Sequence, residues 1–148
     1  MFEVDDVDRE IIEQYTADAR QSYHEISRKI GIAVSTVQDR TKKLEKNGII
    51  KGYTAILDYE KLGLMVTAIT EVTTIGGKLS EVEKRLAKLR NAIAVYDVAG
   101  ATDAVVLGKF RSTSELSKFT KAIQGIPNVN RTETHIVLAV VKEELPKF

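Results

Sequence analysis

The residues with the clearest chemical potential in this sequence are basic and polar side chains clustered between positions 28 and 51. This segment carries seven Lys or Arg residues and two acidic ones, although the whole chain of 148 residues has a formal charge of only +1. The preceding segment, residues 3–25, is acidic, with eight carboxylates and two bases. Because the two segments nearly cancel, the net charge conceals a local positive surface whose chemistry suits a polyanion such as double-stranded DNA.

A helix over residues 34–46 would separate the apolar side chains of this segment from its charged ones. Its outward face would be polar near the N-terminus and basic towards the C-terminus, as expected for a helix that meets base edges first and phosphates further along. In such a helix Gln38 can form hydrogen bonds with adenine, and Arg40 can do so with guanine or a phosphate. Asp39 can accept a hydrogen bond from cytosine. The alternative is a helix face that is merely solvated. The candidate DNA-binding residues are Ser35, Thr36, Gln38, Asp39, Arg40, Lys42, Lys43 and Lys46.

Two short helices joined by a tight turn must position that face. Ser22 and Glu25 form a capping-box pattern that predicts a helix start, and Gly31 supplies the positive φ that often ends a helix. Ser35 and Gln38 repeat the capping pattern and predict the start of the third helix. With a first helix predicted over residues 6–16, the arrangement is typical of a helix-turn-helix.

The second region of the chain alternates strands and helices in the order β-α-β-β-α-β, which is the ferredoxin-like pattern. Helices in such a domain cover one sheet face only. The predicted last strand has apolar residues on both of its sides from Ile136 to Val141, so we expect the bare face to be buried by oligomerisation. The expected strands cover residues 49–57 (a linking strand), 64–74, 93–99, 104–110 and 129–142, and helices are expected to begin at Ser80 and Ser112.

Several classes of protein do not fit the composition. The chain has no cysteine and only two histidines, so we expect no disulfide, metal site or cofactor. The longest apolar run, residues 136–141, is far shorter than the roughly 18 residues that a membrane-spanning helix needs. The acidic N-terminus is unlike a secretory signal, and we therefore expect a cytoplasmic protein. The sequence has no Gly-rich phosphate loop, Gly-x-Ser-x-Gly elbow or His-Glu-x-x-His motif, so we expect no catalytic residues.

The chain resembles the leucine-responsive/AsnC-type regulators of bacteria and archaea, also called feast/famine regulators. The resemblance is most specific over residues 32–53, IAVSTVQDRTKKLEKNGIIKGY, which are similar to the family's third helix and its exit. The opening residues 5–12 and the turn at residues 100–103 also fit the family pattern. The fold expected is α+β: a winged-type helix-turn-helix domain over residues 1–50, a linking strand and hinge over residues 51–63, and a ferredoxin-like domain over residues 64–148.

The resemblance implies that the second domain forms dimers, assembles into octamers or other even-numbered rings, and binds an amino acid between dimers. Ala101 stands where many members have an acidic or polar residue, while Asp103 fits the pattern. Free turn amides and a carboxylate can bind an amino acid, although these residues can also simply make a hairpin turn. The implied effector-binding residues are Gly100, Ala101, Thr102 and Asp103 of one subunit with Thr132 and Thr134 of a neighbour.

Three functions remain open from the sequence. The leading one is a sequence-specific DNA-binding transcription regulator tuned by an amino-acid-like effector. The second is an enzyme resembling siroheme decarboxylases on the same scaffold, which the basic segment and the scarcity of histidine disfavour. The third is an architectural DNA binder without an effector, which the sequence does not separate from the first.

Overall fold

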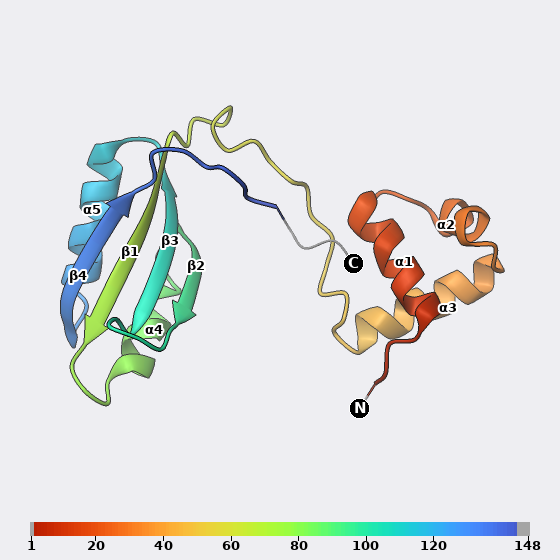
Figure 1. The fold of residues 1–148 in the computed structure, drawn as a ribbon, viewed down its shortest axis with the longest axis horizontal. Coiled ribbons are helices and arrows are strands. Elements are labelled where there is room, and N and C mark those ends of the chain that lie inside the picture. Colours follow the sequence, from red (N-terminus) through yellow and green to blue (C-terminus); the bar gives the residue numbers. More distant parts are fainter. Residues whose placement is uncertain (1, 145–148) are drawn as a thin grey trace. The chain divides into compact units, whose positions relative to one another are not determined.

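The computed structural model describes residues 2–144, and the contacts among them divide the chain into two compact units (Figure 1). The first unit comprises the residues up to 56 and the second extends from Leu57 to Lys142. The boundary between them falls within the segment 51–63 that the sequence predicts to be a hinge. No helix in the described part of the chain is both long and apolar enough to cross a membrane.

The first unit consists of α1 (Asp6–Ala17), α2 (Tyr23–Ile30) and α3 (Val34–Lys46). Asp5 caps α1 and Ser22 caps α2, each through a complete capping box, so the predicted starts of these helices are confirmed. Apolar side chains from all three helices form one core, because each helix turns one apolar stripe inward. The fully buried members of this core are Ile11, Ile26, Val37 and Leu44.

The predicted serine caps of two helices are wrong. α3 begins at Val34 with Ala33 as its cap residue, and α4 (Leu79–Leu86) begins after Lys78; neither cap residue makes a side-chain hydrogen bond to the helix. Ser35 and Ser80 therefore lie inside the first turn. Their backbone is already helical, and a capping side chain must come from the non-helical residue that precedes the helix.

The second unit is a four-stranded antiparallel sheet with two helices, as the ferredoxin-like pattern predicts. The sheet order is β2-β3-β1-β4, so the first and last strands pair although they are far apart in sequence. β2 and β3 form the predicted hairpin around residues 98–103. The strands are β1 (Val66–Thr74), β2 (Ala92–Asp97), β3 (Ala104–Phe110) and β4 (Val129–Ile136), and the second helix is α5 (Thr113–Gln124), capped by Ser112.

Both helices of the second unit pack on the same face of the sheet (Figure 1). Val82 and Leu86 of α4, Ile123 of α5 and Val106 of β3 are fully buried between the two layers. Phe110 and Phe119 meet edge to face there, with ring centroids 4.9 Å apart. This layer of apolar side chains forms the core of the second unit.

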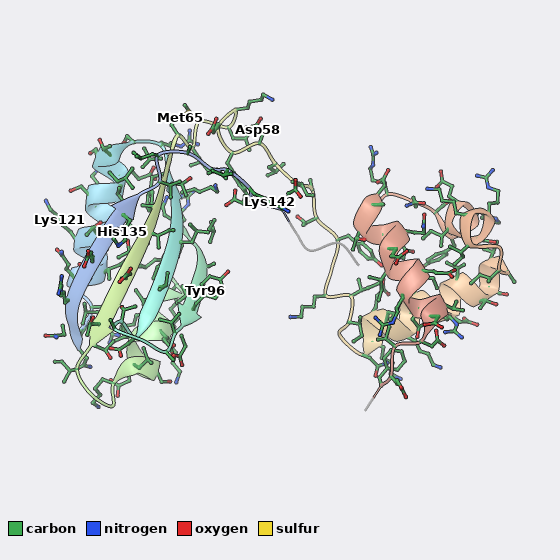
Figure 2. The ribbon with its side chains drawn as sticks, viewed as in Figure 1. Asp58, Met65, Tyr96, Lys121, His135 and Lys142 are labelled. Atoms are coloured by element: carbon green, nitrogen blue, oxygen red, sulfur yellow. The ribbon has the colours of Figure 1, made fainter. Side chains whose placement is uncertain are left out.

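The opposite face of the sheet carries no helix from the part of the chain that the structure describes. Ile69 in the centre of this face is 37% exposed, and Tyr96 on the edge strand β2 is 58% exposed. His135 on β4 lies with its Nε2 atom 3.3 Å from Oε1 of Glu71 on the neighbouring β1. Figure 2 labels Tyr96 and His135 on the two outer strands of the sheet. This uncovered sheet face therefore mixes apolar side chains with charged ones.

The predicted linking strand over residues 49–57 is wrong. The structure describes no strand before Val66, and residues 51–57 pair with no strand in the described part of the chain. An apolar, β-branched composition favours an extended backbone, but a strand also needs a neighbour to supply hydrogen-bond partners. This segment has no such neighbour among residues 2–144.

The predicted last strand is too long. β4 ends at Ile136, and the pairing with β1 closes where the amide of Val137 donates to the carbonyl of Thr67. β1 itself begins at Val66, which this register places opposite position 138, so β1 offers no partner to the residues beyond it. Leu138 and Val141 are 99% and 97% exposed in the single chain, so residues 137–141 do not extend the strand, and their burial by oligomerisation stays a prediction.

Candidate nucleic-acid interface and effector turn

The turn between α2 and α3 sets the position of the candidate recognition helix. Gly31 ends α2 with φ at 75°, in the left-handed region that glycine adopts without steric cost. The hydroxyl group of Ser27 donates to the carbonyl of Ile32 at 2.5 Å across the turn. These two features give the chain a sharp reversal between two short helices, as in a helix-turn-helix.

The outward face of α3 is polar and accessible. Its lysine side chains form no ion pair with any residue from 2 to 144, and no hydrogen bond joins the side chains of Ser35, Thr36 or Asp39 to that part of the chain. Exposed, unpaired ammonium groups can neutralise phosphates without first breaking a contact within the protein. The exposed candidates are Ser35, Thr36, Asp39, Lys42, Lys43 and Lys46, and Gln38 is half-buried on the flank.

Arg40 differs from the other candidates because its guanidinium group is already bound. Its Nη1 atom donates to Oδ1 of Asp5 at 2.6 Å and to Oδ1 of Asp8 at 3.0 Å. Asp8 is buried, with 4% of its surface exposed. The hydrogen bond from Arg40 and the amide of Asp8 lower the pKa of Asp5, so this carboxylate stays ionised. Arg40 therefore joins α3 to the capped start of α1.

The C-terminal end of α3 is held by an aromatic contact. The hydroxyl group of Tyr53 donates to Oε1 of Glu45 at 2.9 Å, and its ring meets that of Tyr15 edge to face at 5.3 Å. Burial, together with the Glu45 carboxylate, raises the pKa of Tyr53, so its hydroxyl group remains a donor. This contact positions the chain that leaves α3.

The turn at residues 100–103 is hydrogen-bonded to β1. The hydroxyl group of Thr102 and the amide of Asp103 both donate to the carbonyl of Val72, at 2.9 and 3.0 Å. Oδ2 of Asp103 accepts from the amide of Thr74 at 2.6 Å and from its hydroxyl group at 3.0 Å. One oxygen of Asp103, the carboxylate among the candidate effector-binding residues, is thus used within the chain, and Gly100 and Ala101 form the exposed tip.

Thr132 and Thr134 lie on β4, across β1 from that turn. Thr132 pairs with Val72, whose carbonyl accepts from the turn, and Thr134 pairs with Thr70. The hydroxyl group of Thr132 accepts from Nε2 of Gln124 at 3.2 Å, and that of Thr134 lies 3.1 Å from the hydroxyl group of Thr70. The structure therefore brings Thr132 and the turn to the same end of the sheet within one chain, on either side of β1.

Sequence reasoning missed the contacts of Arg40 and a group of residues at the other end of the sheet. The acidic start of α1 and the lone Arg in the first half of α3 were visible, but their pairing joins residues more than 30 positions apart. Arg90, Arg111 and Lys109 line a common cavity although no motif connects them. Only the packing of the second unit brings them together.

Comparison with known proteins agrees with this division of the chain. A winged helix-turn-helix DNA-binding domain matches residues 4–51, and the Lrp/AsnC ligand binding domain matches residues 67–146. The chain belongs to the Lrp/AsnC family. The resemblance inferred from residues 32–53 is thereby confirmed, together with the α+β fold and the helix-turn-helix.

Lrp/AsnC relatives match over nearly their whole length. An uncharacterised HTH-type transcriptional regulator of Pyrococcus furiosus is 42% identical, with 97% of each chain covered. The structure of AsnC from Escherichia coli is similar with a TM-score of 0.92 and 25% identity, covering 99% of each chain. A transcriptional regulator of Neisseria meningitidis, solved as a complex with L-methionine, shares the fold with a TM-score of 0.88 at 23% identity, covering 97% of each chain.

Proposed function

We propose that this Lrp/AsnC-family protein is a sequence-specific transcription regulator that reads double-stranded DNA with the exposed face of α3. The observation that carries the proposal is the row of exposed lysines on that helix, Lys42, Lys43 and Lys46, which form no ion pair with residues 2–144. These lysines would neutralise phosphates, while the polar side chains in the first half of α3 would meet base edges in the major groove. Those polar side chains are Ser35, Thr36, Gln38 and Asp39.

Arg40 has a different role in this proposal. Its guanidinium group is bound to Asp5 and Asp8, so a contact with guanine or a phosphate would first have to break those hydrogen bonds. We assign Arg40 to positioning α3 rather than to reading DNA.

We also propose that the protein acts as an even-numbered homo-oligomer, a dimer that assembles further into an octamer or a similar ring. The support is the uncovered sheet face, where Ile69 and Tyr96 are exposed and no helix among the described residues packs. Burying such a face against a second copy removes apolar surface from water. A dimer also presents two recognition helices to a pseudo-palindromic site. Light scattering tests the subunit count.

An amino acid is the proposed effector, bound near Gly100, Ala101, Thr102 and Asp103 with Thr132 and Thr134 nearby. The match to a ligand-binding domain and the L-methionine complex of the N. meningitidis regulator support this chemistry. We propose a cytoplasmic regulator without enzymatic activity, because the regulators it resembles are named for transcription and not for catalysis. Adding siroheme and recording absorbance tests the enzyme alternative, and a thermal-shift screen of the twenty amino acids tests the effector. A true effector at a hundredfold excess over its Kd adds about 2.7 kcal/mol of stability.

The experiment that tests DNA binding is a titration of the protein with DNA from upstream of its own gene at several salt concentrations. Replacing Lys43 with Ala should weaken binding and flatten its salt dependence, because one phosphate contact is lost. Lys121→Ala is the matched control: Lys121 is exposed on α5, as Figure 2 labels it, and lies outside the proposed interface.

A further inference from the structure

A cavity of about 340 Å³ lies in the second unit, at the end of the sheet away from the turn at residues 100–103. The turn precedes β3, and the cavity gathers around the last residue pairs of that strand, where Lys109 lies opposite Thr67 of β1. The seven residues of β3 separate the two places by about 20 Å at 3.3 Å per residue. The cavity is therefore distinct from the proposed effector turn.

The charged side chains that line this cavity are mostly cationic. Arg90, Arg111 and Lys109 face it together with a single carboxylate, Glu115. The volume is at the lower end of the range for small-molecule sites in proteins. The two arginines outnumber the one carboxylate, which favours a ligand that carries negative charge.

The one carboxylate that lines the cavity, Glu115, already accepts hydrogen bonds from neighbouring residues of the protein. Oε2 of Glu115 accepts from the backbone amide of Arg111 at 2.6 Å, and Oε1 accepts from Nδ2 of Asn91 at 3.2 Å. The amide hydrogen bond is the main cause that lowers the pKa of Glu115, with further contributions from Asn91 and the charges of Arg111 and Arg90. Glu115 thus fixes the start of α5 and remains ionised without an ion pair to either arginine.

The two guanidinium groups are available for a ligand. Neither Arg90 nor Arg111 makes a side-chain hydrogen bond or ion pair with any residue from 2 to 144. Lys109 differs, because it is 6% exposed, its ammonium group lies 5.3 Å from the centre of the Tyr59 ring, and Nζ is 3.4 Å from Oγ1 of Thr67. An arginine presents two parallel N–H groups that match both oxygens of a carboxylate.

Apolar side chains complete the cavity. Leu64, from the segment before β1, and Ile93 line it beside the Tyr59 ring. Ile93 falls where the register between β2 and β3 shifts, between Ala92 and Ala94, and such an irregularity re-aims a side chain relative to a regular strand. A ligand in this cavity can therefore place an apolar group on Leu64 and Ile93 while its charged end meets the arginines.

We propose that this cavity is a binding site for a small organic carboxylate, with Arg90 and Arg111 holding the carboxylate group and Leu64, Ile93 and the Tyr59 ring contacting the apolar part. The site uses neither α3 nor the turn at residues 100–103. It gives the protein a second place at which a metabolite can bind, and it stands whether or not the proposed DNA and amino-acid binding is correct.

Isothermal titration calorimetry of the full-length protein tests the proposal with two probes, benzoate and hexanoate. Both should bind, and benzylamine and inorganic phosphate should not, because the first has the wrong charge and the second lacks an apolar group. Arg90→Ala and Arg111→Ala should each weaken binding about tenfold or more, the effect of losing a hydrogen bond to a charged group. Lys88→Ala, which removes an exposed cation two residues from Arg90 and outside the cavity, should bind as the unchanged protein does.

Because Arg90 and Arg111 are exposed, replacing them with Ala should leave the fold intact. Circular dichroism melting curves of the unchanged protein and of the Arg90, Arg111 and Lys88 variants should therefore coincide. Absence of heat with both carboxylates overturns the proposal. It is also overturned if phosphate binds and the carboxylates do not, or if the Arg90 and Arg111 variants bind the probes as well as the Lys88 variant.

Discussion

Arg40 on α3 donates a hydrogen bond of 3.0 Å from Nη1 to Oδ1 of Asp8 on α1, and that carboxylate is 4% exposed. Oδ2 of Asp8 also accepts from the amide of Asp5 at 3.3 Å in the capping box of α1. One buried carboxylate thus both closes the start of the first helix and receives the arginine of the recognition helix. The orientation of α3 depends on this link between two distant parts of the sequence.

Arg40→Ala should lower the free energy of unfolding by about 2 kcal/mol, because it leaves the buried carboxylate of Asp8 without its charged partner. Urea unfolding followed by circular dichroism measures the change. Lys42→Ala is the matched control on the same helix, and its stability should stay within about 0.5 kcal/mol of the unchanged protein, since Lys42 is exposed and without a partner among the described residues. Equal stabilities of the two variants would contradict the assigned role of Arg40.

The same link predicts a dependence of stability on pH. The pKa of Asp5 is lowered from its usual 3.8, mainly by the hydrogen bond from Arg40, so in acid the unfolded state binds more protons than the folded one. The stabilisation is present above the unfolded pKa and is lost as the pH falls through the folded pKa. Urea midpoints between about pH 5 and 2 should fall more steeply for the unchanged protein than for Arg40→Ala. Parallel curves would contradict this account.

Local patterns predicted the three helices of the first unit, although the predicted cap of α3 is wrong. The capping box at Ser22 and the left-handed Gly31 depend on neighbouring residues, so their spacing in the sequence is sufficient. The link from Arg40 to Asp8 joins residues 32 positions apart, and composition did not indicate which carboxylates it would reach. The end of β4 likewise depends on where β1 begins, and a local apolar pattern contains no information about that.

Asp103→Ala should lower the stability of the protein even without an effector, by about 1 to 2 kcal/mol, because the amide and hydroxyl group of Thr74 lose their acceptor. Thermal unfolding of the effector-free protein measures this. Asp97→Ala, at the exposed end of β2, removes a carboxylate that makes no hydrogen bond to a described residue and should have little effect. If Asp103→Ala were as stable as the unchanged protein but no longer bound an amino acid, Asp103 would serve the ligand alone and not the fold.

The candidate sites show the same limit of sequence reasoning. The exposed face of α3 followed from helical periodicity, since one helix carries all of its residues. The turn at residues 100–103 was visible as a motif, but the use of its carboxylate by Thr74 depends on the neighbouring strand. The cationic cavity combines residues from the segment before β1, the start of β2, the end of β3 and α5, so no single stretch of sequence predicted it.

The salt dependence of DNA affinity for single lysine variants of α3 tests the central claim most directly. The logarithm of the affinity is plotted against the logarithm of salt concentration for the unchanged protein, for Lys42→Ala, Lys43→Ala and Lys46→Ala, and for the control Lys121→Ala. Each α3 variant should reduce the magnitude of the slope by about 0.9, the value for one lost phosphate contact, while the control should keep the slope of the unchanged protein. DNA binding that is insensitive to salt, or α3 variants whose slopes equal that of the control, would contradict the assignment of α3 as the DNA-reading helix.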